Sequence, residues 1–308
     1  TVPELYEIKY SRGVRLLGGS ILGLAGTLNM CLFPILGSKF VVGFTGMDPS
    51  WVNPVMIILL IIVVFYTLMG GMVSVVLTDF AQFVLLTIGF LLGTYFILVH
   101  PDLGWDTITT SLEQHKGVDA FDPITNPSYG WIFVLYFISI SFVSIVWQPE
   151  ISRPLSTEDS SVARKVFWIQ GLTSVGRAVI PMFWGAAAFA WTHLPSYTGT
   201  YASDGQSAVP EMLGQILPVG VAGLLLAGMF AAFMSTHDSY FLTWSSVITQ
   251  DIVAPLRKKP FPTASRVRLT RILIVLMGGY VLYWSLFYKG REDIWDYMAV
   301  TGGIYFTG

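Results

Sequence analysis

Two long runs of apolar residues constrain the fold of this chain more than any other feature. They read MIILLIIVVFYTLMG from residue 56 and FVLLTIGFLLGTYFILV from residue 83. Such runs suit the ~30 Å hydrocarbon core of a bilayer, where every backbone polar group must be satisfied inside a helix or a closed barrel. Barrel strands alternate apolar and polar residues, and these runs do not alternate. They therefore predict transmembrane α-helices.

Charge and cysteine content exclude several other classes of protein. Charged residues make up 12% of the 308 positions, against about 25% in an ordinary soluble domain. The formal net charge of −2 provides no basic field for nucleic acid, and the single Cys31 excludes a disulfide framework or a thiolate metal cluster. We therefore expect an all-α polytopic membrane protein with no nucleic-acid partner.

Seven complete apolar runs and one truncated run define the expected helices. They lie near residues 14–42, 52–70, 75–99, 129–149, 166–191, 219–247 and 270–288, with a partial helix at 294–308. The stretches 100–128 and 192–214 are rich in turn-forming residues and predict extramembrane loops. We expect residues 1–308 to form a single transmembrane domain. The chain starts at Thr1 without a signal peptide and its last run is too short to cross a bilayer, so we interpret it as an internal fragment.

The distribution of Lys and Arg predicts the orientation of the helices. Of the 17 basic residues, twelve lie on the side of residues 1–13, three lie on the opposite side and two fall within expected helices. Basic residues concentrate in the cytoplasmic loops of membrane proteins. We therefore expect residues 1–13 to be cytoplasmic and the 100–128 and 192–214 loops to lie outside, in a multi-pass protein of the plasma (cell inner) membrane.

Ionisable side chains at membrane depth cost about 2.5–3.5 kcal/mol each, so each one needs a specific explanation. Lys39 lies near the outer end of its run, where we expect the side chain to snorkel to the headgroups. Arg177 lies inside an expected helix, which favours an ion pair with an acid elsewhere in the bundle. Asp79 is either an acid near a helix N-terminus, stabilised by the helix dipole, or a functional carboxylate.

Residues 234–239, which read MSTHDS, form a polar cluster inside an otherwise apolar run. At the helical period, Ser235, Thr236, Asp238 and Ser239 fall on one face about 160° wide. His237 points to the other side, which argues against a membrane-embedded enzyme that uses it with Asp238 as an acid/base pair. Two interpretations of the polar face remain: hydrogen bonds between helices, or oxygen ligands for a small hard cation such as Na⁺.

Four short motifs follow one another along residues 1–251. They read TVPELYEIKY at 1–10, YTLMGG and TDFAQ within 66–82, QPEISR at 148–153, and AFMST and SSVITQD within 232–251. Together they resemble signatures of the sodium:solute symporter family, and most closely those of its sodium/proline-type members. The resemblance implies a leucine-transporter-type bundle of two inverted five-helix repeats, of which this chain would cover core helices three to ten, the last one truncated.

The resemblance also implies sodium sites. The main site falls on the Ala232 carbonyl and the hydroxyls of Ser235 and Thr236. A second position, used in some members, falls on Asp79, Ser235, Asp238 and Ser239. Asp238 stands where a hydroxyl is more usual in that second position. Further ligands of the main site are expected on a broken first helix upstream of this chain.

The substrate is expected to be a small amino acid or organic anion rather than a sugar. Sugar-transporting members have asparagines on the sixth core helix and a glutamine on the tenth. Residues 137–147 contain no asparagine, and Met298 stands about where the glutamine would be. Candidates for the substrate wall are Ser141, Ser144 and Trp147, for which ordinary helix packing is the alternative.

These observations predict a secondary active transporter that couples Na⁺ to the uptake of a small organic solute by alternating access. It would need no organic cofactor and would not be an enzyme, and its partners would be the bilayer, the solute and the co-transported Na⁺. The alternative function is a symporter-like membrane sensor coupled to a cytoplasmic signalling module.

Overall fold

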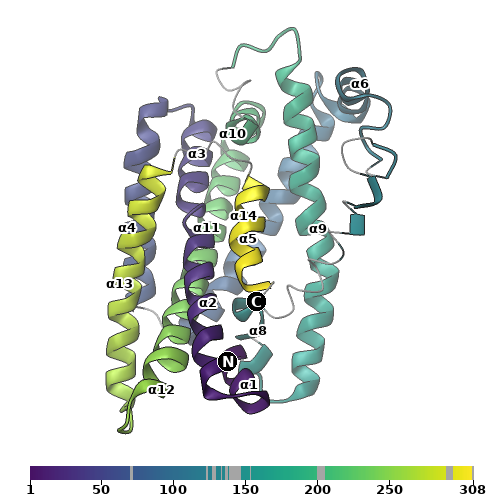
Figure 1. Cartoon of the computed structure of the whole chain (residues 1–308). Helices are drawn as coiled ribbons and strands as arrows, with labels where there is room; N and C mark the ends of the chain where they lie inside the picture. Colours follow the sequence, from purple (N-terminus) through teal and green to yellow (C-terminus); the bar gives the residue numbers. More distant parts are fainter. Residues whose placement is uncertain are drawn as a thin grey trace. The chain divides into compact units, whose positions relative to one another are not determined.

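A computed structural model describes the chain except for residues 70–71, 123, 127–129, 133, 136–137, 139–146, 153, 200–204, 289–293 and 307–308. The described residues form helices and no strand (Figure 1). The helices are α1 Val2–Lys9, α2 Arg12–Met30, α3 Phe33–Thr45, α4 Val52–Met69, α5 Met72–Val99, α6 Gly104–Lys116, α8 Gln148–Ser152, α9 Ser160–Thr192, α10 Gly205–Ile216, α11 Val219–Val247, α12 Ala254–Leu256, α13 Thr263–Phe287 and α14 Ile294–Phe306. Short 3₁₀ turns lie at Pro49–Trp51 and Pro154–Ser156, and a π-helical turn, η4, lies at Ile248–Val253.

Six segments of the described chain are long and apolar enough to cross a membrane. They are Arg12–Thr45, Pro49–Met69, Thr78–Val99, Ser160–Thr192, Val219–Leu256 and Thr263–Phe287. The expectation of an all-α chain with membrane-crossing helices is confirmed. Most of the expected helix at 129–149 lies outside the described residues. The expected loops at 100–128 and 192–214 contain α6 and α10.

The expected helix at 14–42 is broken, because α2 ends at Met30 and α3 begins at Phe33. Pro34 has no backbone N–H to continue the first helix and is well placed in the first turn of the next one. Two carbonyls at the break accept side-chain hydrogen bonds: Tyr297 donates to Leu28 and Ser285 donates to Cys31, each at 2.6 Å. These bonds stabilise the break inside an apolar environment.

The chain divides into two compact units. One comprises Thr1–Ser38, Ser50–Phe83 and Phe230–Gly308, and the other comprises Lys39–Pro49 and Val84–Met229. Helices α3, α5 and α11 each contribute residues to both units. That residues 1–308 act as a single transmembrane domain stays a prediction.

Close helix packing in the second unit depends on glycine. Trp184 of α9 donates from Nε1 to Thr94 Oγ1 at 3.0 Å and lies against Gly93, where a Cβ would come within 2.7 Å of the indole. Gly214 of α10 lies still closer to α3, since a Cβ there would be 2.1 Å from the Phe44 carbonyl oxygen. At this second position a backbone atom would have to move to admit any side chain.

We therefore expect Gly214→Ala to destabilise the protein by about 2 kcal/mol, the usual cost of forcing an extra methyl group into a packed core. Gly223→Ala in α11 is the matched control, because a Cβ there meets no atom of the described residues within 4 Å. Alanine at this control position should be neutral or slightly stabilising. Thermal unfolding of the purified variants measures both effects. Equal unfolding midpoints for the two variants would show that α10 does not pack on Phe44 in this way.

Candidate functional site

A carboxylate of α5 and a hydroxyl of α11 meet within the first unit. Ser235 Oγ donates a hydrogen bond to Asp79 Oδ1 at 2.5 Å, although the two residues are 156 positions apart in the sequence. Both side chains are half-buried. Helix α5 begins at Met72, so Asp79 lies two turns inside it, and the helix dipole falls off within the first turn. The interpretation of Asp79 as an acid at a helix N-terminus is therefore wrong.

Two further oxygens lie in the same turn of α11. Thr236 Oγ1 donates to the Ala232 carbonyl at 2.9 Å. A hydroxyl has one donor and two acceptor lone pairs, so Ser235 and Thr236 both retain lone pairs after donating these bonds. The turn therefore presents a carbonyl, two hydroxyls and, through Ser235, the Asp79 carboxylate.

The next turn of α11 buries an acid and an imidazole on different sides. Asp238 and His237 are both fully buried. Ser239 Oγ donates to Asp238 Oδ1 at 3.3 Å, whereas His237 Nδ1 is bonded to the Phe233 carbonyl at 2.8 Å and its ring packs edge-on against Phe33. The imidazole thus lies among aromatic rings. The helical period predicted only that it points away from the side of Asp238.

The motif that contains Asp79 also ties α4 to α5. The Tyr66 hydroxyl and Thr78 Oγ1 lie 2.5 Å apart and share a hydrogen bond. This bond connects the last turn of α4 to the residue before Asp79. Sequence reasoning named both residues in a motif but did not predict their contact.

Of the three candidates for a substrate wall, Ser141 and Ser144 lie outside the described residues. Trp147 is buried immediately before α8, and its carbonyl accepts from the backbone N–H groups of Glu150 and Ile151. A role in substrate binding stays a prediction for all three.

The two basic residues that fall within expected helices, Lys39 and Arg177, have different surroundings in the structure. Lys39 Nζ donates a hydrogen bond to Gln206 Oε1 of α10 at 2.8 Å, and the residue is half-buried. Snorkelling of Lys39 to the headgroups stays a prediction. Arg177 is exposed on α9 and makes no ion pair with any residue that the structure describes. The expected structural ion pair of Arg177 is thus absent from the described part of the chain.

Comparison with known proteins identifies the family. The model of the sodium:solute symporter family matches residues 15–305. The chain belongs to the sodium:solute symporter family. The resemblance read from the four motifs is confirmed, and the family consists of transporters rather than enzymes.

Several curated members of the sodium:solute symporter family align with most of this chain. A sodium/sialic acid symporter of Aliivibrio fischeri is 28% identical over 89% of this chain and 56% of its own length. A second one, from Proteus mirabilis, is 27% identical over 82% of this chain and 52% of its own length. The human high affinity choline transporter 1 is 25% identical over 78% of this chain and 42% of its own length. The chain thus spans about half the length of the curated relatives it matches.

A solved structure has the same fold. It is described as the substrate-bound outward-open state of a Na⁺-coupled sialic acid symporter with a novel Na⁺ site, and it matches with a TM-score of 0.79 and 22% identity. The match covers 99% of this chain and 65% of that chain. The leucine-transporter-type helix bundle expected from the motifs is therefore confirmed.

This member of the sodium:solute symporter family also contains a buried charge cluster that sequence reasoning missed. Asp251 is fully buried in η4 and accepts from Thr1 Oγ1 at 2.7 Å and from Arg15 Nε at 3.0 Å. Arg15 also pairs with Glu7 at 2.6 Å. The cluster ties α1 and α2 to the end of the helix that carries Ser235. Asp251 is the last residue of the fourth motif. Its place in that motif was the sequence signal that could have pointed to this cluster.

Proposed function

We propose that this protein is a secondary active transporter that couples the entry of Na⁺ to the uptake of a small organic solute by alternating access. Its membership of the sodium:solute symporter family supports Na⁺ coupling. The observation that carries the proposal is the hydrogen bond between Ser235 and Asp79, because it joins a hydroxyl and a carboxylate from two helices at membrane depth. We propose the plasma membrane as its location, with residues 1–13 on the cytoplasmic side.

Two sodium positions are proposed on α11 and α5. The main one uses the Ala232 carbonyl, Ser235 and Thr236, and the second one uses Asp79, Ser235, Asp238 and Ser239. Oxygen ligands suit a hard cation, and the lone pairs that Ser235 and Thr236 retain after donating their hydrogen bonds are available to it. The main position offers neutral oxygens alone from these residues, so its ion would be held weakly enough to be released on each cycle.

The transported solute is proposed to be a small organic anion or amino acid. The sialic acid symporters among the relatives are named for an organic acid, which agrees with this class. Other relatives are named for choline and glucose. We keep Ser141, Ser144 and Trp147 as candidates for contact with the solute.

Uptake into proteoliposomes tests the proposed function. The purified protein is reconstituted, an inward gradient of either Na⁺ or K⁺ is imposed, and a panel of radiolabelled amino acids, carboxylated sugars, choline and glucose is supplied. We expect at least one anion or amino acid to accumulate transiently above its external concentration with Na⁺ only. Equal accumulation under the two gradients for every solute would contradict Na⁺ coupling.

A further inference from the structure

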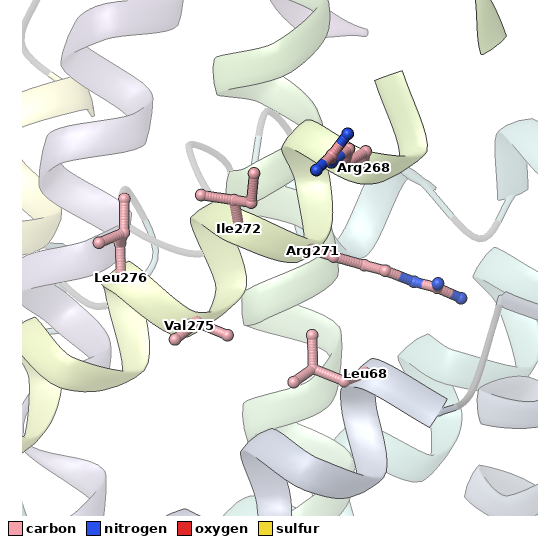
Figure 2. Close-up of a pocket in the computed structure, with 6 residues that line it drawn as sticks. All are labelled: Leu68, Arg268, Arg271, Ile272, Val275 and Leu276. Carbon is pink, nitrogen blue, oxygen red and sulfur yellow. The ribbon is translucent and has the colours of Figure 1, made fainter. Parts of the chain in front are cut away.

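A groove of about 330 Å³ lies between α4 and α13, within the first unit (Figure 2). Leu68 of α4 forms one wall, and five residues of α13 form the other. These five are Arg268, Arg271, Ile272, Val275 and Leu276. They occupy positions i, i+3, i+4, i+7 and i+8, which is one face of an α-helix.

Packing explains why the groove opens at this place. A Cβ on Gly278 would lie 2.7 Å from Val64 Cγ2, so α13 and α4 approach closely at that level. One turn away, toward the C-terminus of α4 and the N-terminus of α13, Leu68 and Val275 face each other across the groove (Figure 2). Ile272, Val275 and Leu276 are 49%, 51% and 63% exposed, so this apolar surface is available to a ligand.

The groove is lined by apolar atoms, and the guanidinium groups of the two arginines lie outside that lining. The two arginines lie at one end, and Ile272 and Leu276 lie further along α13 (Figure 2). Residues 268–276 span roughly 12 Å of helix axis. Along this distance two arginines are followed by apolar residues. A phospholipid at a membrane surface has the matching arrangement, with a charged headgroup followed by acyl chains.

The arginines are available to an anion. Arg268 and Arg271 are exposed, and neither forms an ion pair with a residue that the structure describes. Arg266, in the same helix, instead donates hydrogen bonds to the Phe261 carbonyl and to Gln250 Oε1. The charges of Arg268 and Arg271 therefore have no acidic partner in the described part of the chain, and the groove beside them belongs to the span Thr263–Phe287.

We propose that this groove binds one anionic phospholipid, with the phosphate headgroup at the end bordered by Arg268 and Arg271 and an acyl chain along Leu68 and Val275. Exposed arginines at the end of an apolar groove suit an anionic headgroup whose acyl chain follows the groove. The twelve basic residues on this side of the chain predict the cytoplasmic side, whose leaflet is rich in anionic lipids. The proposal is independent of the transported solute. It gives α4 and α13 a lipid that packs between them at the membrane surface.

Native mass spectrometry of the purified protein tests the proposal, with phosphatidylglycerol or phosphatidylcholine added to a neutral detergent. We expect wild-type protein to retain one phosphatidylglycerol in preference to phosphatidylcholine. The double variant R268Q/R271Q should bind phosphatidylglycerol roughly 30-fold more weakly, at about a fivefold loss per basic side chain. The matched control is K258Q/K259Q, which removes the same charge from exposed residues outside the groove, and it should bind as wild type does.

A third variant distinguishes a lipid from a free anion. Val275→Trp fills the apolar part of the groove without touching the arginines, so it should also abolish the preference for phosphatidylglycerol. Inorganic phosphate at millimolar concentration should not displace the lipid. Equal losses in the two double variants, full binding by Val275→Trp, displacement by phosphate, or equal retention of phosphatidylcholine would each overturn the proposal.

Discussion

Asp79→Asn should weaken the apparent affinity for Na⁺ in solute uptake on the order of 10- to 100-fold, as expected for the loss of a charged partner. The substitution preserves the shape of the side chain and a hydrogen-bond acceptor for Ser235, whose hydroxyl lies 2.5 Å from the carboxylate. The negative charge is removed, and one acceptor oxygen becomes an amide nitrogen. Ser235→Ala should have an effect at least as large, because Ser235 belongs to both proposed sodium positions. Uptake measured as a function of Na⁺ concentration gives both values.

Ser245→Ala is the matched control for Ser235→Ala. Ser245 is a buried serine of the same helix whose hydroxyl donates to the Phe241 carbonyl at 2.5 Å, and it has no part in the proposed sodium positions. Its replacement should leave the dependence on Na⁺ unchanged. If Ser245→Ala and Ser235→Ala shift the Na⁺ dependence equally, the effect is a general weakening of α11 and the proposed positions are wrong.

Arg15→Ala should destabilise the protein by roughly 3–5 kcal/mol, the cost of leaving one partner of a buried ion pair without the other. Asp251 is fully buried, and Arg15 holds it through Nε at 3.0 Å and through a second guanidinium nitrogen at 2.9 Å. A loss of this size exceeds a third of the stability of many domains. We therefore expect little monodisperse protein after extraction in detergent.

Two comparisons isolate the ion pair. Arg12→Ala removes an exposed arginine from the first turn of the same helix, and it should leave extraction and thermal unfolding unchanged. The double variant R15M/D251L replaces both buried charges with apolar groups, so it should recover most of the lost stability. Destabilisation by Arg12→Ala to the same degree, or no recovery in the double variant, would contradict the role of the pair.

Hydropathy predicted the helical class and the approximate positions of the six membrane-crossing segments in the described chain, because an apolar run of sufficient length has few alternatives in a bilayer. Hydropathy did not predict the residues at which helices begin and end. Helix α9 begins at Ser160, ahead of the expected 166, because Asp159 caps its N-terminus by accepting from the N–H groups of Ser161 and Val162. The break before Phe33 was missed because the run stays apolar through it, although Pro34 was a usable signal.

The candidate site was predictable only in part. The helical period placed Ser235, Thr236, Asp238 and Ser239 on one face, but their relation to Asp79 came from the family resemblance. Periodicity describes one helix at a time, so it carries no information on partners that are distant in the sequence. The bonds of Lys39 to Gln206 and of Arg15 to Asp251 were missed for this reason.

Binding of radioactive sodium to the purified protein tests the central claim most directly, because it needs no knowledge of the solute. The account predicts saturable binding to wild-type protein that is displaced by unlabelled Na⁺ and not by K⁺, strongly reduced binding to Ser235→Ala, and unchanged binding to Ser245→Ala. Binding of equal strength to wild type and Ser235→Ala would contradict the claim that α11 carries the sodium site.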